Sequence, residues 1–401
     1  MAVSSIVSVL ASLVFVASAP AAYALGSQQE DPRSVTALST ALRTDQDVEV
    51  RKTAAWALGQ IEDPAAVAAL SEALGGDSNV EVRKAAAWAL GQIDNRAAVP
   101  GLVSGLNDTD VEVRSTVVWA LGQLEDRSAV EPLAQAVTDT DVSIRKNAVW
   151  ALGQIEDRAA VPVLATALQD ADVEVRQQAA WALGQIESAD AVDGLTTVLQ
   201  DTEPEVRKQA AWALGQIESA RAVAALSNTL RTDDDAKVRS TAAWALGQIE
   251  NEEAIPALAE AMSDPNVDVR RMAAWAIGQI EPGSAPQALI DALRDDDPEV
   301  RASSVWALSQ IEDPSAVDGL RTLLNDDNSE VRRSALRALS RIGDDAAISA
   351  LADMLSDPDP EVRREAAAAL GGKRRGAAPR PRPRPQPRPR PQPRPRPNGG
   401  D

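Results

Sequence analysis

Side chains able to do covalent or metal chemistry are of few types in this chain. Its 401 residues include no histidine and no cysteine, which removes imidazole bases, thiol nucleophiles and most zinc or haem ligation. The 60 acidic residues fall mostly at predicted helix starts and turns, where they suit the helix dipole. A solvated face is their main interpretation, and a Ca²⁺ or Mg²⁺ site in the turn at residues 295–297 is the alternative. We therefore expect a binding protein with no enzymatic activity, no cofactor and no metal site.

The chemistry that remains is recognition by nine regularly spaced tryptophans. Successive tryptophans are 31 or 32 residues apart, and the other aromatic residues, Phe15 and Tyr23, lie near the start of the chain. Tryptophan is enriched in binding hot spots, and a glutamine follows each one by four residues, about one helical turn. The candidate partner-binding residues are Trp56, Gln60, Trp88, Gln92, Trp119, Gln123, Trp150, Gln154, Trp181, Gln185, Trp212, Gln216, Trp244, Gln248, Trp275, Gln279, Trp306 and Gln310.

The same spacing predicts the elements that position these residues. A fixed period of this length is typical of a solenoid, in which each unit packs only on its neighbours. Each unit reads as two helices: Val50 and Leu58 lie on a buried stripe of the first helix, and Asp63-Pro64 signals the start of the second. An Asp or Asn that can cap the first helix precedes it in every unit except one, where Glu203 takes its place.

A helical wheel predicts where the tryptophans point. Trp56 falls about 145° from the centre of the buried stripe, on the side of Lys52 and Gln60. We therefore expect an exposed ladder of indoles, since a long apolar surface usually marks an interaction site. The alternative is a self-packed ladder, in which each indole lies flat over the neighbouring repeat. A glycine three residues after each of the first eight tryptophans, such as Gly59, predicts close approach of helix backbones.

An arginine recurs in every unit, and each can pair with a turn aspartate of its own or of an adjacent unit. We interpret this series as structural, because a network of ion pairs stabilises more than isolated surface pairs do. Its members are Arg51, Arg83, Arg114, Arg145, Arg176, Arg207, Arg239, Arg270, Arg301, Arg332 and Arg363.

The motif DxEVRxxAAWALGQIEDxxAVxxL, repeated over residues 34–372, resembles the HEAT-like repeats of phycobilisome (PBS) lyases and those of designed alpha-helical consensus repeat proteins. The resemblance implies an all-α fold, a right-handed α-α superhelix of two-helix repeats. In the designed proteins the variable binding positions lie on the EVR helix, which lines the concave face, and they match Lys52, Thr53, Trp56 and Gln60. Deoxyhypusine hydroxylases, a related HEAT-like family, hold iron through His–Glu pairs that a chain without histidine cannot provide. No specific catalytic motif of the pigment lyases is matched.

The first 24 residues read as a secretory signal peptide. An uncharged apolar run at residues 6–19 precedes the small-residue site Ala22-Tyr23-Ala24, so cleavage is expected after Ala24. An uncleaved membrane anchor formed by residues 6–25 is the alternative, although the run is short for a membrane span. Either interpretation places the array beyond a cytoplasmic membrane, in the periplasm, the cell envelope or the medium. Residues 25–33 read as a linker.

Residues 373–401 read as a disordered, basic tail. Their net charge is +9, which leaves −29 for the rest of the chain. Proline alternates with Arg or Gln over residues 379–397, a composition that favours polyproline II. The tail is a stiff spacer, an arm for anionic surfaces, or a ligand of the array's own acidic, Trp-lined groove. The candidate anion-binding residues are Arg380, Arg382, Arg384, Arg388, Arg390, Arg394 and Arg396.

The predicted stripe changes character near the end of the array. Arg337 replaces the tryptophan, Arg341 replaces the glutamine, and Arg333 falls on the same stripe, so we expect the groove to end in a basic patch.

Together these features favour an exported scaffold that binds a protein or peptide partner along a concave, Trp/Gln-lined face. No small-molecule substrate is expected, and the tail is a second contact element. The alternatives are a lyase-like accessory protein for a bilin chromophore and a mechanical spacer in the cell envelope.

Overall fold

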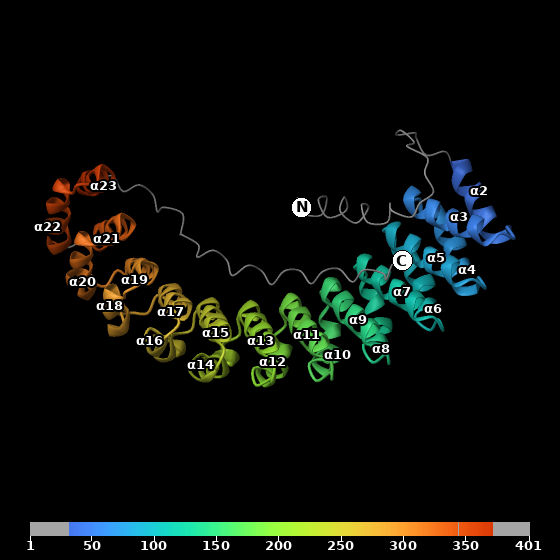
Figure 1. The fold of residues 1–401 in the computed structure, drawn as a ribbon, viewed down its shortest axis with the longest axis horizontal. Helices are drawn as coiled ribbons and strands as arrows, with labels where there is room; N and C mark the ends of the chain where they lie inside the picture. The colour runs from blue at the N-terminus through green and yellow to red at the C-terminus, as the bar shows by residue number, and fades with distance from the viewer. Residues whose placement is uncertain (1–31, 344, 372–401) are drawn as a thin grey trace.

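The computed structural model describes residues 32–343 and 345–371, and within them the chain forms 22 α-helices, α2 to α23. The helices stack as an arc of two-helix units (Figure 1). Odd-numbered helices line the concave side and even-numbered helices lie on the convex side, so we call them inner and outer helices. The all-α, right-handed superhelix predicted from the repeat is confirmed.

The inner helices carry the EVR motif. They are α3 (Val48–Ile61), α5 (Val80–Gln92), α7 (Val111–Gln123), α9 (Val142–Ile155), α11 (Val173–Ile186), α13 (Pro204–Ile217), α15 (Ala236–Ile249), α17 (Val267–Ile280), α19 (Pro298–Ile311), α21 (Ser329–Ile342) and α23 (Pro360–Leu370).

The outer helices are mostly shorter. They are α2 (Pro32–Thr44), α4 (Val67–Gly76), α6 (Val99–Gly105), α8 (Val130–Ala136), α10 (Val161–Ala167), α12 (Val192–Val198), α14 (Val223–Thr232), α16 (Ile255–Ala261), α18 (Gln287–Asp291), α20 (Val317–Thr322) and α22 (Asp345–Asp353).

Single 3₁₀ turns extend the outer helices. Those that precede an outer helix are η2 (Pro64–Ala66), η3 (Arg96–Ala98), η4 (Arg127–Ala129), η5 (Arg158–Ala160), η6 (Ala189–Ala191), η7 (Ala220–Ala222), η8 (Glu252–Ala254) and η10 (Pro314–Ala316). Those that follow one are η9 (Ala292–Arg294), η11 (Leu323–Asn325) and η12 (Met354–Ser356).

The inner helices begin where the capping residues predict. Asp47 accepts hydrogen bonds from the backbone amides of Glu49 and Val50, at 2.8 and 3.3 Å, which satisfies two of the donors that a helix start leaves unpaired. Glu203, the one exception to the Asp or Asn pattern, makes no such bond, and α13 begins instead with Pro204 at its first position. Proline is suited to that position because its missing amide has no helical partner there.

The core is one continuous layer between the inner and outer helices. Leu58 of α3 and Leu70 of α4 are fully buried, as are their equivalents in the central repeats. Each inner helix from α5 to α21 also contacts the inner helices before and after it, and the buried alanines of these helices, such as Ala87, keep them close. Burial against neighbours holds the array together because no unit buries its apolar faces alone.

The repeat array was predicted at residues 34–372, and the described helices run from Pro32 to Leu370. The predicted signal peptide, most of the predicted linker and the basic tail, with its seven candidate anion-binding arginines, lie outside the described residues. In the described ranges, no helix has the length and apolar character that a membrane crossing requires.

Candidate interaction surface on the inner helices

The tryptophans lie on the inner helices, as predicted, but most are sealed from solvent. Trp119, Trp150, Trp181, Trp212 and Trp275 are only 3–7% exposed. Trp88, Trp244 and Trp306 are half-buried, and Trp56 is 40% exposed. The expectation that all nine indoles face outward is therefore wrong, and the self-packed alternative describes the central repeats.

The glycines explain where the rings go. A Cβ atom built on Gly184 would lie 2.7 Å from Cζ3 of Trp212 and 3.0 Å from Cα of Ala213, in the next inner helix. The same two contacts recur at all eight glycines that follow a tryptophan, with 2.6–3.1 Å to the indole. The predicted close approach of backbones is confirmed, and the gap left by each glycine also receives the edge of the next indole.

The helical wheel failed here for a physical reason. It considered only the packing of an inner helix on its own outer helix, and it placed Trp56 far from that interface. An inner helix has two further neighbours in the stack, and a long side chain can reach sideways over the preceding one. Trp56 is the exception that supports this account, because no inner helix precedes α3 in the described part of the chain.

The predicted glutamines lie one turn beyond the tryptophans and remain accessible. Gln60 is exposed, and the other eight are half-buried. The structure therefore separates the two halves of the predicted stripe: most of the indoles are buried, whereas the glutamine side chains remain accessible to solvent. Binding at these residues is not tested by the geometry and stays a prediction.

The recurring arginines form what we call the Arg–Asp ladder along the N-terminal ends of the inner helices. Arg176 donates from Nε and Nη2 to Asp201, at 2.7 and 3.0 Å, and from Nη1 to the carbonyls of Asp170 and Ala171, at 2.9 and 3.3 Å. Ten such pairs recur along the array, so the predicted structural role is confirmed, and each aspartate lies in the turn that joins the arginine's own unit to the next one. The pairs are Arg51–Asp77, Arg83–Asp108, Arg114–Asp139, Arg145–Asp170, Arg176–Asp201, Arg207–Asp233, Arg239–Asp264, Arg270–Asp295, Arg301–Asp326 and Arg332–Asp357.

The ladder keeps its carboxylates ionised. Desolvation raises the pKa of Asp77. The hydrogen bonds that its carboxylate accepts from Arg51 and from the Asn79 amide, and the charges of Arg51 and Arg83, lower this pKa by more, so it lies below its ordinary value. The same balance lowers the pKa of Asp108, Asp170, Asp201, Asp264, Asp295 and Asp326.

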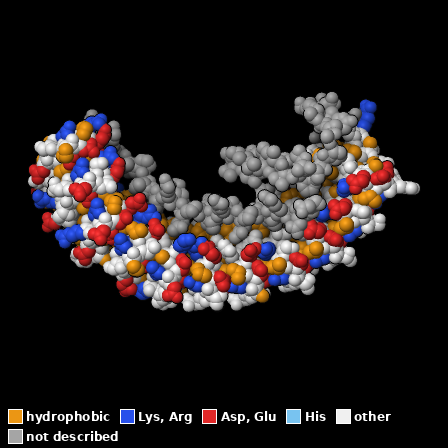
Figure 2. Space-filling model, in the orientation of Figure 1, with side chains coloured by type: hydrophobic (Ala, Val, Ile, Leu, Met, Phe, Trp, Pro, Cys, Tyr) orange, Lys and Arg blue, Asp and Glu red, His pale blue; other side chains and the backbone are white. Residues whose placement is uncertain are grey.

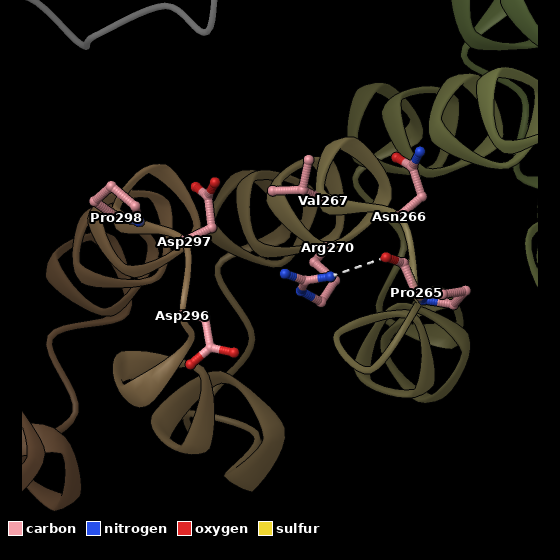
Figure 3. A pocket seen from close by; sticks show the side chains of 7 residues that line it. All are labelled: Pro265, Asn266, Val267, Arg270, Asp296, Asp297 and Pro298. Atoms are coloured by element: carbon pink, nitrogen blue, oxygen red, sulfur yellow. Dashed lines mark hydrogen bonds between the residues drawn. The ribbon is translucent and has the colours of Figure 1, made fainter.

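A hollow of about 450 Å³ lies on this ladder between α17 and α19. Figure 3 shows Arg270 in it, with its guanidinium donating to the carbonyl of Pro265 at 3.4 Å. The lining is the ordinary inter-repeat turn, with Pro298 and Asp297 on the far side. Because the chain's own guanidinium already uses the polar groups there, we assign no ligand to this hollow.

The alternative Ca²⁺ or Mg²⁺ site in the turn at residues 295–297 is not supported by the geometry of the turn. Asp295 pairs with Arg270, and Asp297 caps α19 through the amides of Glu299 and Val300. Across the described ranges, no group of three or more acidic side chains is placed to hold a metal ion.

Further charges on the first turns of the inner helices are also paired. Lys52 contacts Glu49 at 2.8 Å, Lys146 contacts Glu174 of the next inner helix at 2.7 Å, and Lys208 pairs with Glu205. Figure 2 shows acidic and basic side chains interspersed on the visible side of the arc, with only small apolar patches between them.

The C-terminal ends of the inner helices carry a different feature, which we call the C-cap acid row. Nine residues there have positive φ, between 45° and 57°, and all nine are acidic and exposed. Side chains with a Cβ rarely adopt this left-handed conformation, and glycine is the usual choice at a helix C-terminus. The row consists of Glu62, Asp94, Glu125, Glu156, Glu187, Glu218, Glu250, Glu281 and Glu312.

In the middle of the row, Glu156 is affected by desolvation and by like charges. Partial desolvation is the largest cause that raises the pKa of Glu156 above its ordinary value, and the charges of Glu125 and Glu187 in the adjacent repeats add to it. Acidic side chains are also unfavourable beside the negative end of the helix dipole. Desolvation also acts on the carboxylates of the Arg–Asp ladder, but there the hydrogen bonds and charges of the arginines outweigh it.

One member of the C-cap acid row, which we call a rung, binds a cationic side chain. Arg341, in the glutamine position of α21, donates to Glu312 of the preceding inner helix from Nε at 3.1 Å and from Nη2 at 3.0 Å. The two arginines that were predicted to share a basic patch with it are paired as well: Arg337 contacts Glu365 at 2.8 Å, and Arg333 pairs with Glu330. The predicted basic end of the groove is therefore largely neutralised.

The C-cap acid row is the feature that sequence reasoning missed. A signal was present, because the repeated GQIED segment places an acid directly after each inner helix. In the tenth unit Gly343 takes that place, with φ +64°. That single glycine at the equivalent position points to a left-handed backbone there.

The chain was compared with known proteins. The model of a family described as HEAT repeats matches residues 18–91, 35–110, 99–176, 161–243, 223–309 and 286–371. No curated protein sequence matches the chain.

Several solved structures are similar to this chain. Importin beta is 15% identical over 84% of this chain and 59% of its own, with a TM-score of 0.59. This chain therefore spans less than two thirds of that protein, and the likeness concerns the fold alone. An engineered protein is 27% identical over 84% of this chain and 98% of its own, with a TM-score of 0.48. The phycocyanin lyase complex of CpcE and CpcF from Nostoc sp. PCC7120 is 25% identical over 60% of this chain and 97% of its own, with a TM-score of 0.35.

The HEAT-repeat matches run through nearly all of the array, and the helices within them have the paired, stacked arrangement that the repeat predicts. The chain therefore belongs to the HEAT-repeat family.

Proposed function

We propose that this protein is an interaction scaffold that holds an extended, arginine-rich polypeptide segment along the C-terminal ends of its inner helices. The contact between Arg341 and Glu312 supports this proposal most directly, because it places a guanidinium on a rung of the C-cap acid row. In the central repeats glutamine takes the position of Arg341. A guanidinium on those rungs would therefore come from another segment.

The stacking distance favours an extended partner. Packed helices lie about 8–10 Å apart. A polyproline II segment rises about 3.1 Å per residue with three residues per turn, so one turn advances about one repeat. A partner of this kind can present a basic side chain to successive rungs without bending.

The glutamines suit the same partner. Each amide has two donors and an acceptor, and the half-buried Gln185 and Gln216 are the second-to-last residues of their helices. Such amides can bind the backbone of an extended segment while the carboxylates bind its guanidinium groups. In this arrangement the buried indoles give the inner face its rigidity, and they are not the contact surface.

The chain contains a segment with the required chemistry, the Pro/Arg alternation of residues 379–397. Its binding to the array of the same or another copy is one form of the proposal. Its binding to an anionic surface, the export of the protein and a role as an envelope spacer remain predictions. No feature of the described residues specifically favours a bilin-related role.

The test compares two triple variants of equal charge. A labelled peptide with the sequence of residues 379–397 is titrated into the full chain by fluorescence anisotropy, with the seven tail arginines replaced by glutamine so that the tail does not compete. Replacing Glu187, Glu218 and Glu250 by glutamine should weaken binding about tenfold, if each contact contributes about 0.5 kcal/mol.

The matched control replaces Glu174, Glu205 and Glu299 by glutamine at the N-terminal ends of the same kind of helix, where these carboxylates already have Lys or Arg partners. This control should bind the peptide as the parent does. Equal weakening in both triple variants would mean that net charge alone attracts the peptide, and the proposal would fail.

A further inference from the structure

The N-terminal end of the described array is an open inter-repeat face. The helix α2 is an outer helix that packs on α3 and α4, and in the described part of the chain it has no inner helix of its own. As a result, no described helix covers the side of α3 that every later inner helix presents to a preceding inner helix.

Two apolar side chains show the consequence. Val50 is 41% exposed, whereas its equivalents Val82 and Val113 are fully buried. Trp56 is 40% exposed, whereas Trp119 is 7% exposed. Both lie in the first inner helix, and their exposure is what the removal of one layer from a stack of repeats would produce.

The chain itself contains a segment that matches the missing layer. Residues 21–26 read AAYALG, and residues 54–59 of α3 read AAWALG. Glu30-Asp31-Pro32 then leads into α2, as Glu62-Asp63-Pro64 leads into the next outer helix. The HEAT-repeat match begins at residue 18, inside the segment that the sequence alone suggested to be a signal peptide.

We propose that residues 18–30 cover this face as a shortened inner helix. Tyr23 then takes the tryptophan position, and Gly26 takes the glycine position, against the indole edge of Trp56. The segment joins α2 directly, so its effective concentration at the face is high. Pro20 suits the first turn of such a helix because its missing amide costs nothing there.

The competing occupant is a second copy of the chain. At the far end of the stack Arg363 binds backbone carbonyls and has no ladder aspartate among the described residues. At the near end Asp45, the equivalent of Asp77, has no ladder arginine there. A head-to-tail copy would join the two. The sequence match and the direct connection favour the chain's own segment, in which Ser18 takes the arginine position and leaves Asp45 to solvent.

The proposal has a consequence for processing. The bond after Ala24, the predicted cleavage site, would lie within the capping helix. Capping and cleavage at that bond therefore exclude each other, and cleavage would uncover Val50 and Trp56. The purified full chain should retain residues 18–30, which its intact mass measures.

The test follows the accessibility of Trp56 inside the folded array. Oxidation of Trp56 by a water-soluble oxidant is measured by peptide mass spectrometry, with Trp119 of the same molecule as the buried reference. The ratio of Trp56 oxidation to Trp119 oxidation should be low in the full chain and in a chain without residues 2–17. It should rise several-fold in a chain without residues 2–30. Gly26→Leu should raise it as well, because a side chain there would meet the indole, whereas Gly76→Leu should not, because a Cβ at Gly76 has no neighbour within 4 Å.

Two results would overturn the proposal. If Trp56 is as reactive in the full chain as in the chain without residues 2–30, nothing caps the face. If Trp56 is protected in both chains, and protection grows with protein concentration and is lost in Asp45→Asn, a second copy is the occupant.

Discussion

At the N-terminal ends of the inner helices the acidic side chains have defined partners, whereas at the C-terminal ends nine acidic residues hold left-handed backbone conformations. The first set stabilises the fold. Aspartates such as Asp172 cap the helices, and ladder pairs such as Arg176–Asp201 bind an inner helix to the turn that leads into the next repeat, with both side chains largely buried.

The second set is unfavourable for stability in three ways. The backbone conformation suits glycine, the helix dipole disfavours an acid, and at Glu156 desolvation and the charges of Glu125 and Glu187 raise the pKa of the carboxyl. Natural proteins tolerate such features mainly where function requires them. The difference between these two rims, the N-terminal and C-terminal ends of the inner helices, supports the proposal that the N-terminal rim builds the scaffold and the C-terminal rim binds the partner.

Low pH should distinguish the two rims most strongly, because it protonates carboxylates along the whole Arg–Asp ladder at once. Ladder carboxyls such as Asp201 have pKa values below the ordinary 3.8, so their stabilising effect is complete above that pH and is lost as the pH falls through the lower, folded-state pKa. We expect helicity, measured by far-UV circular dichroism, to persist at pH 4.5 and to fall steeply below 3.8. A transition centred near 4.5, the ordinary value for glutamate, would contradict a role for the ladder.

Breaking one ladder pair should have the next largest effect. Arg176→Ala leaves Asp201 partly buried without its cation and also removes two bonds to backbone carbonyls. Loss of one partner of a buried ion pair costs about 3 kcal/mol. Because neighbouring repeats support each other, hydrogen exchange should accelerate first in α11 and α13.

The control for that variant is Arg127→Ala. Arg127 also pairs with an aspartate of the next repeat, Asp157, at 3.2 Å, but its side chain is 85% exposed. A surface pair of this kind contributes about 0.5 kcal/mol or less. Equal exchange rates in the two variants would remove the distinction between the ladder and ordinary surface pairs.

The N-terminal rim could be predicted from the sequence, and the physical reason is locality. A cap such as Asp47 acts on amides two or three residues away, and the recurrence of Arg51 at the repeat period requires a partner at the same period. The glycine at position 59 likewise signalled close backbone approach, which the structure confirms.

The inner face and the C-terminal rim could not be derived in the same way. The direction of Trp212 depends on a gap at Gly184 in another repeat, which a wheel of one helix does not contain. The backbone conformation of Glu187 is not a property of its residue type, since glutamate is uncommon at positive φ. The open end at Trp56 could not be predicted, because residues 21–26 carry Tyr23 in place of tryptophan and also read as part of a signal peptide.

A substitution on the C-terminal rim should raise stability, in contrast to those on the ladder. Glu187→Gly removes a side chain from a left-handed position, with φ 51°, and an acid from the negative end of α11. We expect the free energy of unfolding to increase by about 1 kcal/mol, measured by urea denaturation. The reverse change, Gly343→Glu at φ 64°, should lower it by a similar amount. If Glu187→Gly is destabilising, the acid row contributes to the fold, and its interpretation as a functional surface loses its main support.

The smallest effect should come from charge alone on the same rim. Glu156→Gln keeps the length of the side chain and the backbone strain but removes repulsion from Glu125 and Glu187. Because the folded-state pKa of Glu156 is raised above the ordinary 4.5, its ionisation destabilises the fold as the pH rises through that higher value. The variant should therefore exceed the parent in unfolding free energy at pH 7 by about 0.3 kcal/mol, and the difference should vanish below pH 4.5, where the parent's carboxyl is protonated. A gain that persists at low pH would have to come from packing, and the repulsion between neighbouring rungs would then not be what distinguishes this rim from the ladder.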